Sequence, residues 1–286
     1  MERIQRLFRL LESANPQIAG RAALTLFTYP MAPVIRTEAE RRLVRKAQAK
    51  LAEAERADLR VRGFRIATYF FAHTAAQRQG TALLVHGWTS TAAFMTATVD
   101  QLRARGFDVV AFDMPAHGNS TGRRALLMDC VLTMLAVANR YGPIDRVIAH
   151  SFGGPVSTLA LVSELSPALS ETTHLLFIAS PNRLADVTED FARALGLSPD
   201  VQQVFEELLV EPFGGDLGAM DANVLLAGLP NRLTIIHSTD DHEVRFDAAE
   251  RFAKLGGNVA LQQLEGLGHR RILHAQPGVE AVLAAV

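Results

Sequence analysis

From about residue 60 to the C-terminus, the chain alternates between short apolar runs and longer segments with helical spacing. The apolar runs are bounded by charged or turn residues, as is typical of buried strands. The pattern predicts strands at residues 64–71, 81–86, 107–112, 144–149, 174–179, 233–237 and 259–264. It predicts helices at residues 91–105, 124–141, 152–165, 246–255 and from 277 onward. This alternation favours an α/β fold.

Several of these strands are apolar at consecutive positions, such as the run Ala-Leu-Leu-Val at residues 82–85. Continuous apolar runs are expected where helices cover both faces of a parallel sheet. We therefore predict a doubly wound, mostly parallel sheet. We assign this α/β core to residues 59–181 and 230–286.

The alternation stops between Pro181 and Pro230. Helical spacing continues at residues 187–195 and 199–210, without a convincing strand. A loop of this length without secondary structure is improbable in a compact domain. We therefore predict a helical cap insertion at residues 182–229.

Residues 1–58 differ from the core in charge and spacing. They carry 11 basic and 7 acidic side chains, a net charge of +4. Thr37 and Glu40 fit a capping box at the start of a helix that we expect to run to about Ala57. We predict an N-terminal helical extension that packs on the main domain.

The first helix of this extension is predicted to be amphipathic. Its apolar face carries Ile4, Leu7, Phe8 and Leu11, and its other face carries Arg3, Arg6 and Arg9. Arginines beside leucines would also suit an anionic membrane surface or a dimer arm. We expect no membrane attachment, and a homodimer stays an open alternative.

Composition excludes several classes of protein. Hydrophobic residues make up 49% and charged residues 21% of the chain, which excludes a disordered protein. The net charge of −1 gives no reason to expect a nucleic-acid partner. Cys130 is the only cysteine, so no intramolecular disulfide can form. No signal peptide is evident, and Pro30 and Pro33 interrupt the apolar stretch at residues 22–34, so we expect a cytoplasmic protein.

Ser151 lies between a predicted strand and a predicted helix, in the sequence Val-Ile-Ala-His-Ser-Phe-Gly-Gly at residues 147–154. Small residues at Ala149 and Gly153 allow a tight turn that exposes the hydroxyl, although glycine is more usual at the position of Ala149. This context predicts a nucleophile elbow. The alternative is that Ser151 only caps the helix.

Five segments occur in an order that carries a resemblance. They are Leu-Leu-Val-His-Gly-Trp (83–88), Ala-Phe-Asp-Met-Pro-Ala-His-Gly-Asn-Ser (111–120), Ala-His-Ser-Phe-Gly-Gly (149–154), Asp-Asp-His-Glu-Val (240–244) and Gly-Leu-Gly-His (266–269). Together they resemble the serine hydrolases of the α/β-hydrolase fold, over residues 60–286. The extension before residue 60 lies outside this pattern. It resembles that of uncharacterised bacterial members whose last motif continues into Arg-Arg-Ile-Leu.

A serine hydroxyl needs a base to remove its proton. The resemblance implies that the catalytic residues follow the order serine, acid and histidine along the chain. His269, in a glycine-containing loop after the last strand, is the predicted base, in preference to His242 and His274. Asp241 is the predicted acid, since its spacing to Val244 matches the Asp-x-x-Val arrangement. We expect Asp240 to be a turn residue. Asp113, at the end of an earlier strand, is a competing acid, but we expect it to order the turn at residues 114–118.

Two backbone N–H groups are predicted to form an oxyanion hole. One belongs to Phe152, directly after the predicted nucleophile, and the other to Trp88, in the loop after an early strand. The Trp88 side chain either lines an acyl pocket or packs in the core. We expect His86 and His117 to stabilise turns, and Cys130 to be a packed apolar residue.

Arg270 and Arg271 follow the predicted base without a catalytic explanation. We expect them to bind a carboxylate of the cap or the N-terminal helices, with an acidic substrate group as the alternative. We predict no metal and no cofactor. The histidines lack coordinating spacing, and no Gly-x-Gly-x-x-Gly segment follows the early strands.

These observations predict a hydrolase of carboxylic esters or related acyl compounds, which acts through Ser151, His269 and Asp241 on a small-molecule substrate. Carbon–carbon bond hydrolysis, peptidase activity and acyl transfer stay open, because they use the same triad. A binding protein without catalytic activity on the same fold is the alternative from another class. Acyl chain length depends on the pocket beneath residues 182–229 and does not follow from the fold.

Overall fold

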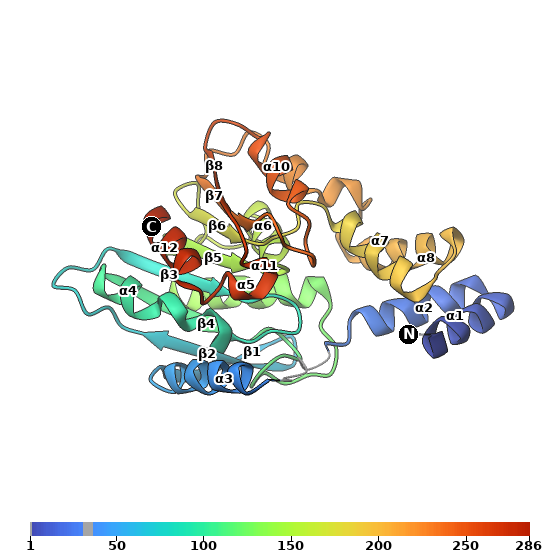
Figure 1. Cartoon of the computed structure of the whole chain (residues 1–286), viewed down its shortest axis with the longest axis horizontal. Helices are drawn as coiled ribbons and strands as arrows, with labels where there is room; N and C mark the ends of the chain where they lie inside the picture. The colour runs from blue at the N-terminus through green and yellow to red at the C-terminus, as the bar shows by residue number, and fades with distance from the viewer. Residues whose placement is uncertain (1, 31–36) are drawn as a thin grey trace.

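The computed structural model describes residues 2–30 and 37–286 and is built around one eight-stranded sheet (Figure 1). The strand order is β1-β2-β4-β3-β5-β6-β7-β8. Only the β1–β2 and β2–β4 pairings are antiparallel, so the predicted mostly parallel sheet is confirmed. The strands are β1 (Glu55–Val61), β2 (Phe64–Phe71), β3 (Gly80–Val85), β4 (Phe107–Phe112), β5 (Arg146–His150), β6 (His174–Ile178), β7 (Leu233–Ser238) and β8 (Val259–Leu264).

Helices cover both faces of the sheet, and the strands divide their side chains between two apolar cores. In β3, Leu83 and Val85 belong to one core, whereas Ala82 and Leu84 belong to the other, as the two-residue period of a strand requires. The first core includes α5 (Leu127–Tyr141), α6 (Gly153–Val162) and α10 (Asp247–Ala253). The second includes α3 (Glu38–Leu51), η1 (Ala92–Thr98), α4 (Val99–Ala104) and α12 (Gln276–Ala285), together with Ile272, which follows α11 (Gly268–Arg271). The fold is therefore doubly wound.

One element of the predicted extension is wrong. The helix expected to reach about Ala57 ends at Leu51, and strand β1 follows it at once. The predicted domain boundary at residue 58 thus falls inside a strand. Because β1 pairs with β2 along its whole length, from Glu55 opposite Phe70 to Val61 opposite Phe64, this edge strand is part of the sheet.

The N-terminal part contains α1 (Glu2–Ala14), α2 (Pro16–Phe27) and α3, and the capping box of Thr37 and Glu40 forms as predicted. Helices α1 and α2 lie beside α7 (Leu184–Leu195) and α8 (Pro199–Val210), to one side of the sheet (Figure 1). Residues 31–36, including the predicted break at Pro33, lie outside the described residues. No helix within residues 2–30 or 37–286 has the length and apolar character needed to cross a membrane.

Residues 182–229 are helical, as their spacing predicts, and contain no strand in this fully described segment. Besides α7 and α8, they form η2 (Glu211–Phe213), η3 (Gly218–Met220) and α9 (Ala222–Leu225). Local sequence explains the boundary between the two long helices. Gly196 ends α7 in the left-handed conformation at φ +66°, and Ser198 caps α8 before Pro199.

Candidate active site

Ser151 occupies a strained turn between β5 and α6. Its φ angle is +50°, a region that residues with a side chain rarely adopt. Two glycines let the neighbouring backbone approach this turn. A Cβ atom on Gly87 would lie 2.9 Å from the Ser151 Cβ, and one on Gly153 would lie 2.6 Å from the Val85 carbonyl oxygen. The turn therefore holds the serine close against the end of β3.

The three residues predicted as a triad lie within hydrogen-bonding distance of one another. The Ser151 Oγ is 3.0 Å from the His269 Nε2, and the His269 Nδ1 is 2.8 Å from the Asp241 Oδ2. A carboxylate only accepts hydrogen bonds, so the Nδ1 carries the proton. The Nε2 lone pair then faces the serine hydroxyl, which is the arrangement that a general base requires.

Asp241 is held as an ionised, fully bonded carboxylate. Its Oδ1 accepts hydrogen bonds from the backbone N–H groups of Glu243 (2.8 Å) and Val244 (2.9 Å). Its Oδ2 faces His269 and also the His237 Nε2 at 3.3 Å. Burial raises the pKa of Asp241, but the hydrogen bonds from His237, His269 and Val244 outweigh it. The pKa is therefore held well below its ordinary value.

Two buried histidines support this arrangement, and neither was predicted from the sequence. The His150 Nε2 donates to the His269 carbonyl oxygen at 2.9 Å, and the His237 Nε2 donates to the Val244 carbonyl oxygen at 2.9 Å. Burial lowers the pKa of His150 to about 3, so its ring is neutral. Their positions were the available signal, because His150 directly precedes Ser151 and His237 lies four residues before Asp241.

The backbone N–H groups of Trp88 and Phe152 lie in the two segments that meet at Ser151. Neither N–H has a hydrogen-bond acceptor among the described residues. The Trp88 and Phe152 rings are in contact, with centroids 5.3 Å apart. His86 fixes the first segment, because its Nδ1 donates to the Gly87 carbonyl oxygen and its Nε2 accepts from the Met114 N–H. Both amides are thus available to a ligand.

The neighbouring polar residues have structural contacts. Asp113 accepts hydrogen bonds from the Ala92 and Asn119 N–H groups and from the Tyr69 hydroxyl, so it orders the turn after β4. The Asp240 Oδ1 accepts from the Leu267 and Gly268 N–H groups in the loop that carries His269.

His117 is also bonded to backbone. It accepts a hydrogen bond from the Thr89 N–H and donates to the Pro115 carbonyl oxygen. Cys130 is fully buried in the apolar core. Both observations agree with the structural roles expected of these side chains.

The expectation for the arginines after His269 is wrong in its choice of partner. Arg270 binds Glu243 through two hydrogen bonds, of 2.9 and 3.1 Å, and Glu243 belongs to the loop after β7. Arg271 donates to the Gly266 carbonyl oxygen. The Glu243 carboxylate also lies 4.0 Å from the His269 Nε2. Arg270 therefore holds an acidic group beside the predicted base.

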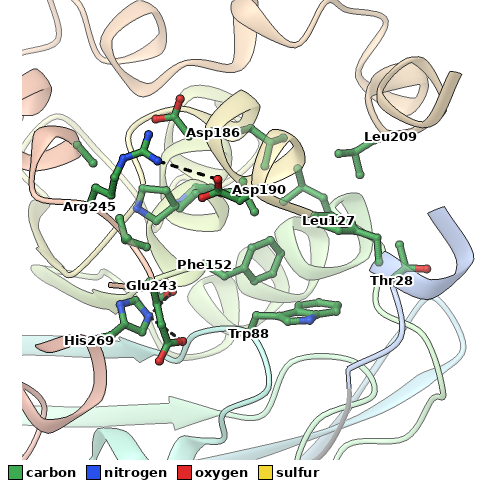
Figure 2. Close-up of a pocket in the computed structure, with 18 of the residues that line it drawn as sticks. Thr28, Trp88, Leu127, Phe152, Asp186, Asp190, Leu209, Glu243, Arg245 and His269 are labelled. Atoms are coloured by element: carbon green, nitrogen blue, oxygen red, sulfur yellow. Dashed lines mark hydrogen bonds and ion pairs between the residues drawn. The ribbon is translucent and has the colours of Figure 1, made fainter. Parts of the chain in front are cut away.

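A pocket of about 210 Å³ opens at Ser151 and His269 (Figure 2). Its walls come from residues that follow the carboxyl ends of the strands, from residues 182–229 and from α2. Trp88 is one of its lining residues and also packs against the first apolar core, so both interpretations of this side chain apply. The other lining residues include Phe27, Thr28, Ala125, Leu127, Phe152, Leu184, Asp186, Val187, Asp190, Leu209, Glu243, Val244 and Arg245.

Residues 82–283 match the model of the alpha/beta hydrolase family. The chain belongs to the α/β-hydrolase family. The match begins within β3 and ends within α12, so it includes all three residues predicted as the triad. It leaves α1, α2, α3, β1 and β2 of this hydrolase outside.

Solved structures share the fold of this hydrolase at low sequence identity. Est1E from Butyrivibrio proteoclasticus, with ferulic acid bound, matches with a TM-score of 0.63 and 19% identity, over 80% of this chain and 98% of its own. A carboxylesterase structure from the thaumarchaeon Nitrososphaera gargenis matches at 0.58 and 16%, over 80% and 96%. The thioesterase domain from the curacin biosynthetic pathway matches at 0.59 and 14%, over 82% and 99%.

Proposed function

We propose that this α/β hydrolase is a serine hydrolase that cleaves a carboxylic ester or a closely related acyl compound. The observation that carries the proposal is the hydrogen-bonded series Ser151, His269 and Asp241, with distances of 3.0 and 2.8 Å, at a turn with positive φ. The fold relatives named as carboxylesterases and as a thioesterase are consistent with an acyl substrate. Residues 182–229 act as the cap of the pocket.

In the proposed reaction, the Ser151 Oγ attacks the acyl carbonyl carbon while its proton passes to the His269 Nε2. Asp241 stabilises the imidazolium through its bond to Nδ1. The N–H groups of Trp88 and Phe152 bind the oxyanion of the tetrahedral intermediate. The intermediate collapses when the leaving-group oxygen takes the proton from Nε2, which leaves an ester between the acyl group and Ser151.

Water completes the cycle by the same route. His269 removes a proton from the water as it attacks the acyl-enzyme carbonyl carbon. The second tetrahedral intermediate collapses as the bond between the acyl carbon and the Ser151 Oγ breaks. His269 returns the proton to Oγ, and the carboxylic acid is released. A group of three or more His, Cys, Asp or Glu side chains arranged to hold a metal ion is absent from residues 2–30 and 37–286.

A fluorophosphonate probe tests the proposal, because it reacts covalently only with an activated serine. We expect labelling of the wild-type protein at Ser151, confirmed by peptide mass spectrometry. The Ser151→Ala and His269→Ala variants should lose labelling while they retain the wild-type circular dichroism spectrum. Absence of labelling in folded wild-type protein would overturn the proposal, and so would equal labelling of Ser151→Ala. Hydrolysis of p-nitrophenyl esters from acetate to palmitate then tests the acyl class.

A further inference from the structure

The C-terminal end of α2 reaches the same pocket as the candidate triad. Phe27 and Thr28 both line it, although more than a hundred residues separate them from Ser151. The Phe27 ring is nearly parallel to the Trp88 ring, with an angle of 16° and centroids 6.5 Å apart. Trp88 in turn contacts Phe152, directly after Ser151. The N-terminal hairpin, defined here as α1 and α2, is therefore linked to the residue beside Ser151 through the Phe27–Trp88 and Trp88–Phe152 ring contacts.

Contacts on both sides hold this end of α2 in place. On the core side, the Thr28 carbonyl oxygen accepts a hydrogen bond from the Ala125 N–H at 2.8 Å. The Thr28 Oγ1 accepts another from the Arg124 Nε at 2.9 Å. Thr28 itself is 1% exposed, whereas Arg124 lies at the surface. Ala125 itself lines the pocket, which means that the end of α2 is bonded directly to another lining residue.

On the other side, the hairpin packs closely on the cap. Gly20 lies so near α8 that a Cβ atom there would be 2.4 Å from the Val204 Cγ1. The Gln5 side chain donates to the Ala194 carbonyl oxygen of α7 at 3.0 Å. The Phe27 ring also meets Phe191 of α7 and Phe205 of α8, with centroids 5.0 and 5.2 Å away. The hairpin thus joins cap and core across the pocket.

The pocket is apolar where the hairpin borders it. Figure 2 shows Leu127, Leu209 and Thr28 on the side away from His269, with Trp88 and Phe152 between them and the base. Charged residues line other parts of the pocket. Two of them, Arg245 and Asp190, form an ion pair at 4.0 Å. An apolar wall favours an uncharged hydrocarbon group, because burying a charge without a partner is costly.

The pocket volume limits the size of that group. An apolar cavity of about 150 Å³ is enough to bind benzene, and the pocket here is about 210 Å³. Phe191 and Phe205 contact Phe27 but do not line the pocket. The Phe27 ring therefore stands between the pocket and the Phe191 and Phe205 rings of α7 and α8.

We propose that the N-terminal hairpin forms part of the acyl-binding pocket and that Phe27 is its specificity-determining residue. The pocket selects an uncharged medium-chain or aryl acyl group, of roughly six to ten non-hydrogen atoms. This inference rests on the proposed hydrolase function for the nature of the ligand. Removal of the Phe27 ring should extend the pocket towards Phe191 and Phe205 and shift the preference to longer chains.

Binding can be measured without turnover, because Trp88 is the only tryptophan of the chain and its ring contacts Phe27. The probe is a series of methyl esters from butanoate to hexadecanoate, titrated into Ser151→Ala protein while Trp88 emission is recorded. We expect the tightest binding near hexanoate to octanoate. In the Ser151→Ala background, Phe27→Ala should move the optimum to chains longer by two to four carbons, with a gain of about fourfold for each additional buried CH₂.

Two further variants make the test decisive. Phe27→Leu keeps an apolar side chain against α8 and should shift the optimum by a smaller amount, so it carries the test if Phe27→Ala does not fold. Leu10→Ala changes an α1 residue that is 64% exposed and should leave the chain-length profile as in wild type. An unchanged profile in folded Phe27→Leu and Phe27→Ala would overturn the inference. So would a loss of equal size for all esters.

The same esters separate this inference from the proposed function when Ser151 is present. A shifted binding profile without hydrolysis or fluorophosphonate labelling would overturn the catalytic proposal and support the hairpin's role in binding. Hydrolysis and labelling together with an unshifted binding profile in the Phe27 variants would support the catalytic proposal and overturn the role of the hairpin in binding. Support for both requires that the order of kcat/KM values along the ester series shift with the binding optimum.

Discussion

The candidate triad and the hairpin wall belong to one pocket, but they are held in different ways. Ser151, Asp241 and His269 follow β5, β7 and β8, and hydrogen bonds fix their backbone or side chains. At the end of the hairpin, hydrogen bonds hold Thr28, but the Phe27 ring is held by contacts between aromatic rings. Hydrogen bonds fix atomic positions, whereas apolar contacts mainly fix a volume.

This difference predicts a division of labour between the two regions. Changes in the triad, at the carboxyl ends of the strands, should lower the rate by the same factor for every acyl chain, because they alter the reacting atoms. Changes in the hairpin should alter the dependence on chain length and leave the reaction of the smallest esters intact. A variant of one region with the effect expected of the other would contradict the division.

The largest effect is expected for Asp241→Asn. The amide cannot accept the His269 Nδ1 proton as the carboxylate does, so His269 loses its correct tautomer and the stabilisation of its charged form. We expect kcat/KM to fall by about 10⁴-fold, by the same factor for acetate and octanoate esters.

Asp240→Asn is the matched control, because Asp240 contacts the Leu267 and Gly268 N–H groups and not the base. An asparagine oxygen can still accept those bonds, so we expect a loss of less than about tenfold. Equal losses in the two variants would contradict the assignment of Asp241 as the acid.

The ease of predicting each region from the sequence follows the same contrast. The elbow at Ser151 and the loop of His269 depend on short local segments, so motif and strand order were sufficient to find them. Strand β1 was mistaken for the end of a helix because residues such as Ala57 favour helices. Its pairing with β2 is a tertiary contact that no local pattern contains. The position of Phe27 in the pocket depends on how α2 docks on α8, which is likewise invisible in its own segment.

The second largest effect is a loss of stability in acid, and the buried histidines that cause it lie in the core. Burial lowers the pKa of His86 to about 4 and the pKa of both His117 and His150 to about 3. No histidine occurs in residues 1–58 or 182–229. Below about pH 6.5 the unfolded chain binds protons at these histidines that the folded chain does not, so stability falls as the pH drops towards 4.

Each such histidine adds a slope of about 1.4 kcal/mol per pH unit to the free energy of unfolding. Urea denaturation at pH 7.5, 6.5 and 5.5 measures the total. The lowered pKa of Asp241 acts in the same direction at lower pH, because its contribution is present above about pH 4 and is lost below it. His150→Gln should reduce the slope of the unfolding free energy against pH by the contribution of one histidine, about 1.4 kcal/mol per pH unit. A midpoint that is constant from pH 7.5 to 5.5 would contradict the burial of neutral histidines.

A smaller effect is expected for Gly20→Val in the hairpin. The new side chain would overlap Val204 and force α2 away from α8. We expect a loss of about 1–3 kcal/mol in the free energy of unfolding. We also expect a fall in kcat/KM for octanoate esters with little change for acetate. Gly215→Val is the control, because only the Phe213 carbonyl oxygen, at 3.7 Å, lies near its Cβ position. A uniform loss across all esters in Gly20→Val would mean that the hairpin also positions the triad.

The smallest effect separates strain at the elbow from close packing in the hairpin. At Ser151 the φ of +50° makes any Cβ unfavourable, so glycine should fit better there. Ser151→Gly and Ser151→Ala both remove the hydroxyl, and they differ only in the Cβ. We expect the glycine variant to be more stable than the alanine variant by about 1 kcal/mol, measured by urea denaturation. Gly20 provides the contrast, because its φ is ordinary and the space around it is small. Gly20→Ala should lower the stability through overlap with Val204 and not through an unfavourable φ. Equal stability of the two Ser151 variants would show that the elbow stores no strain, and the positive φ would then carry no weight in the assignment of the nucleophile.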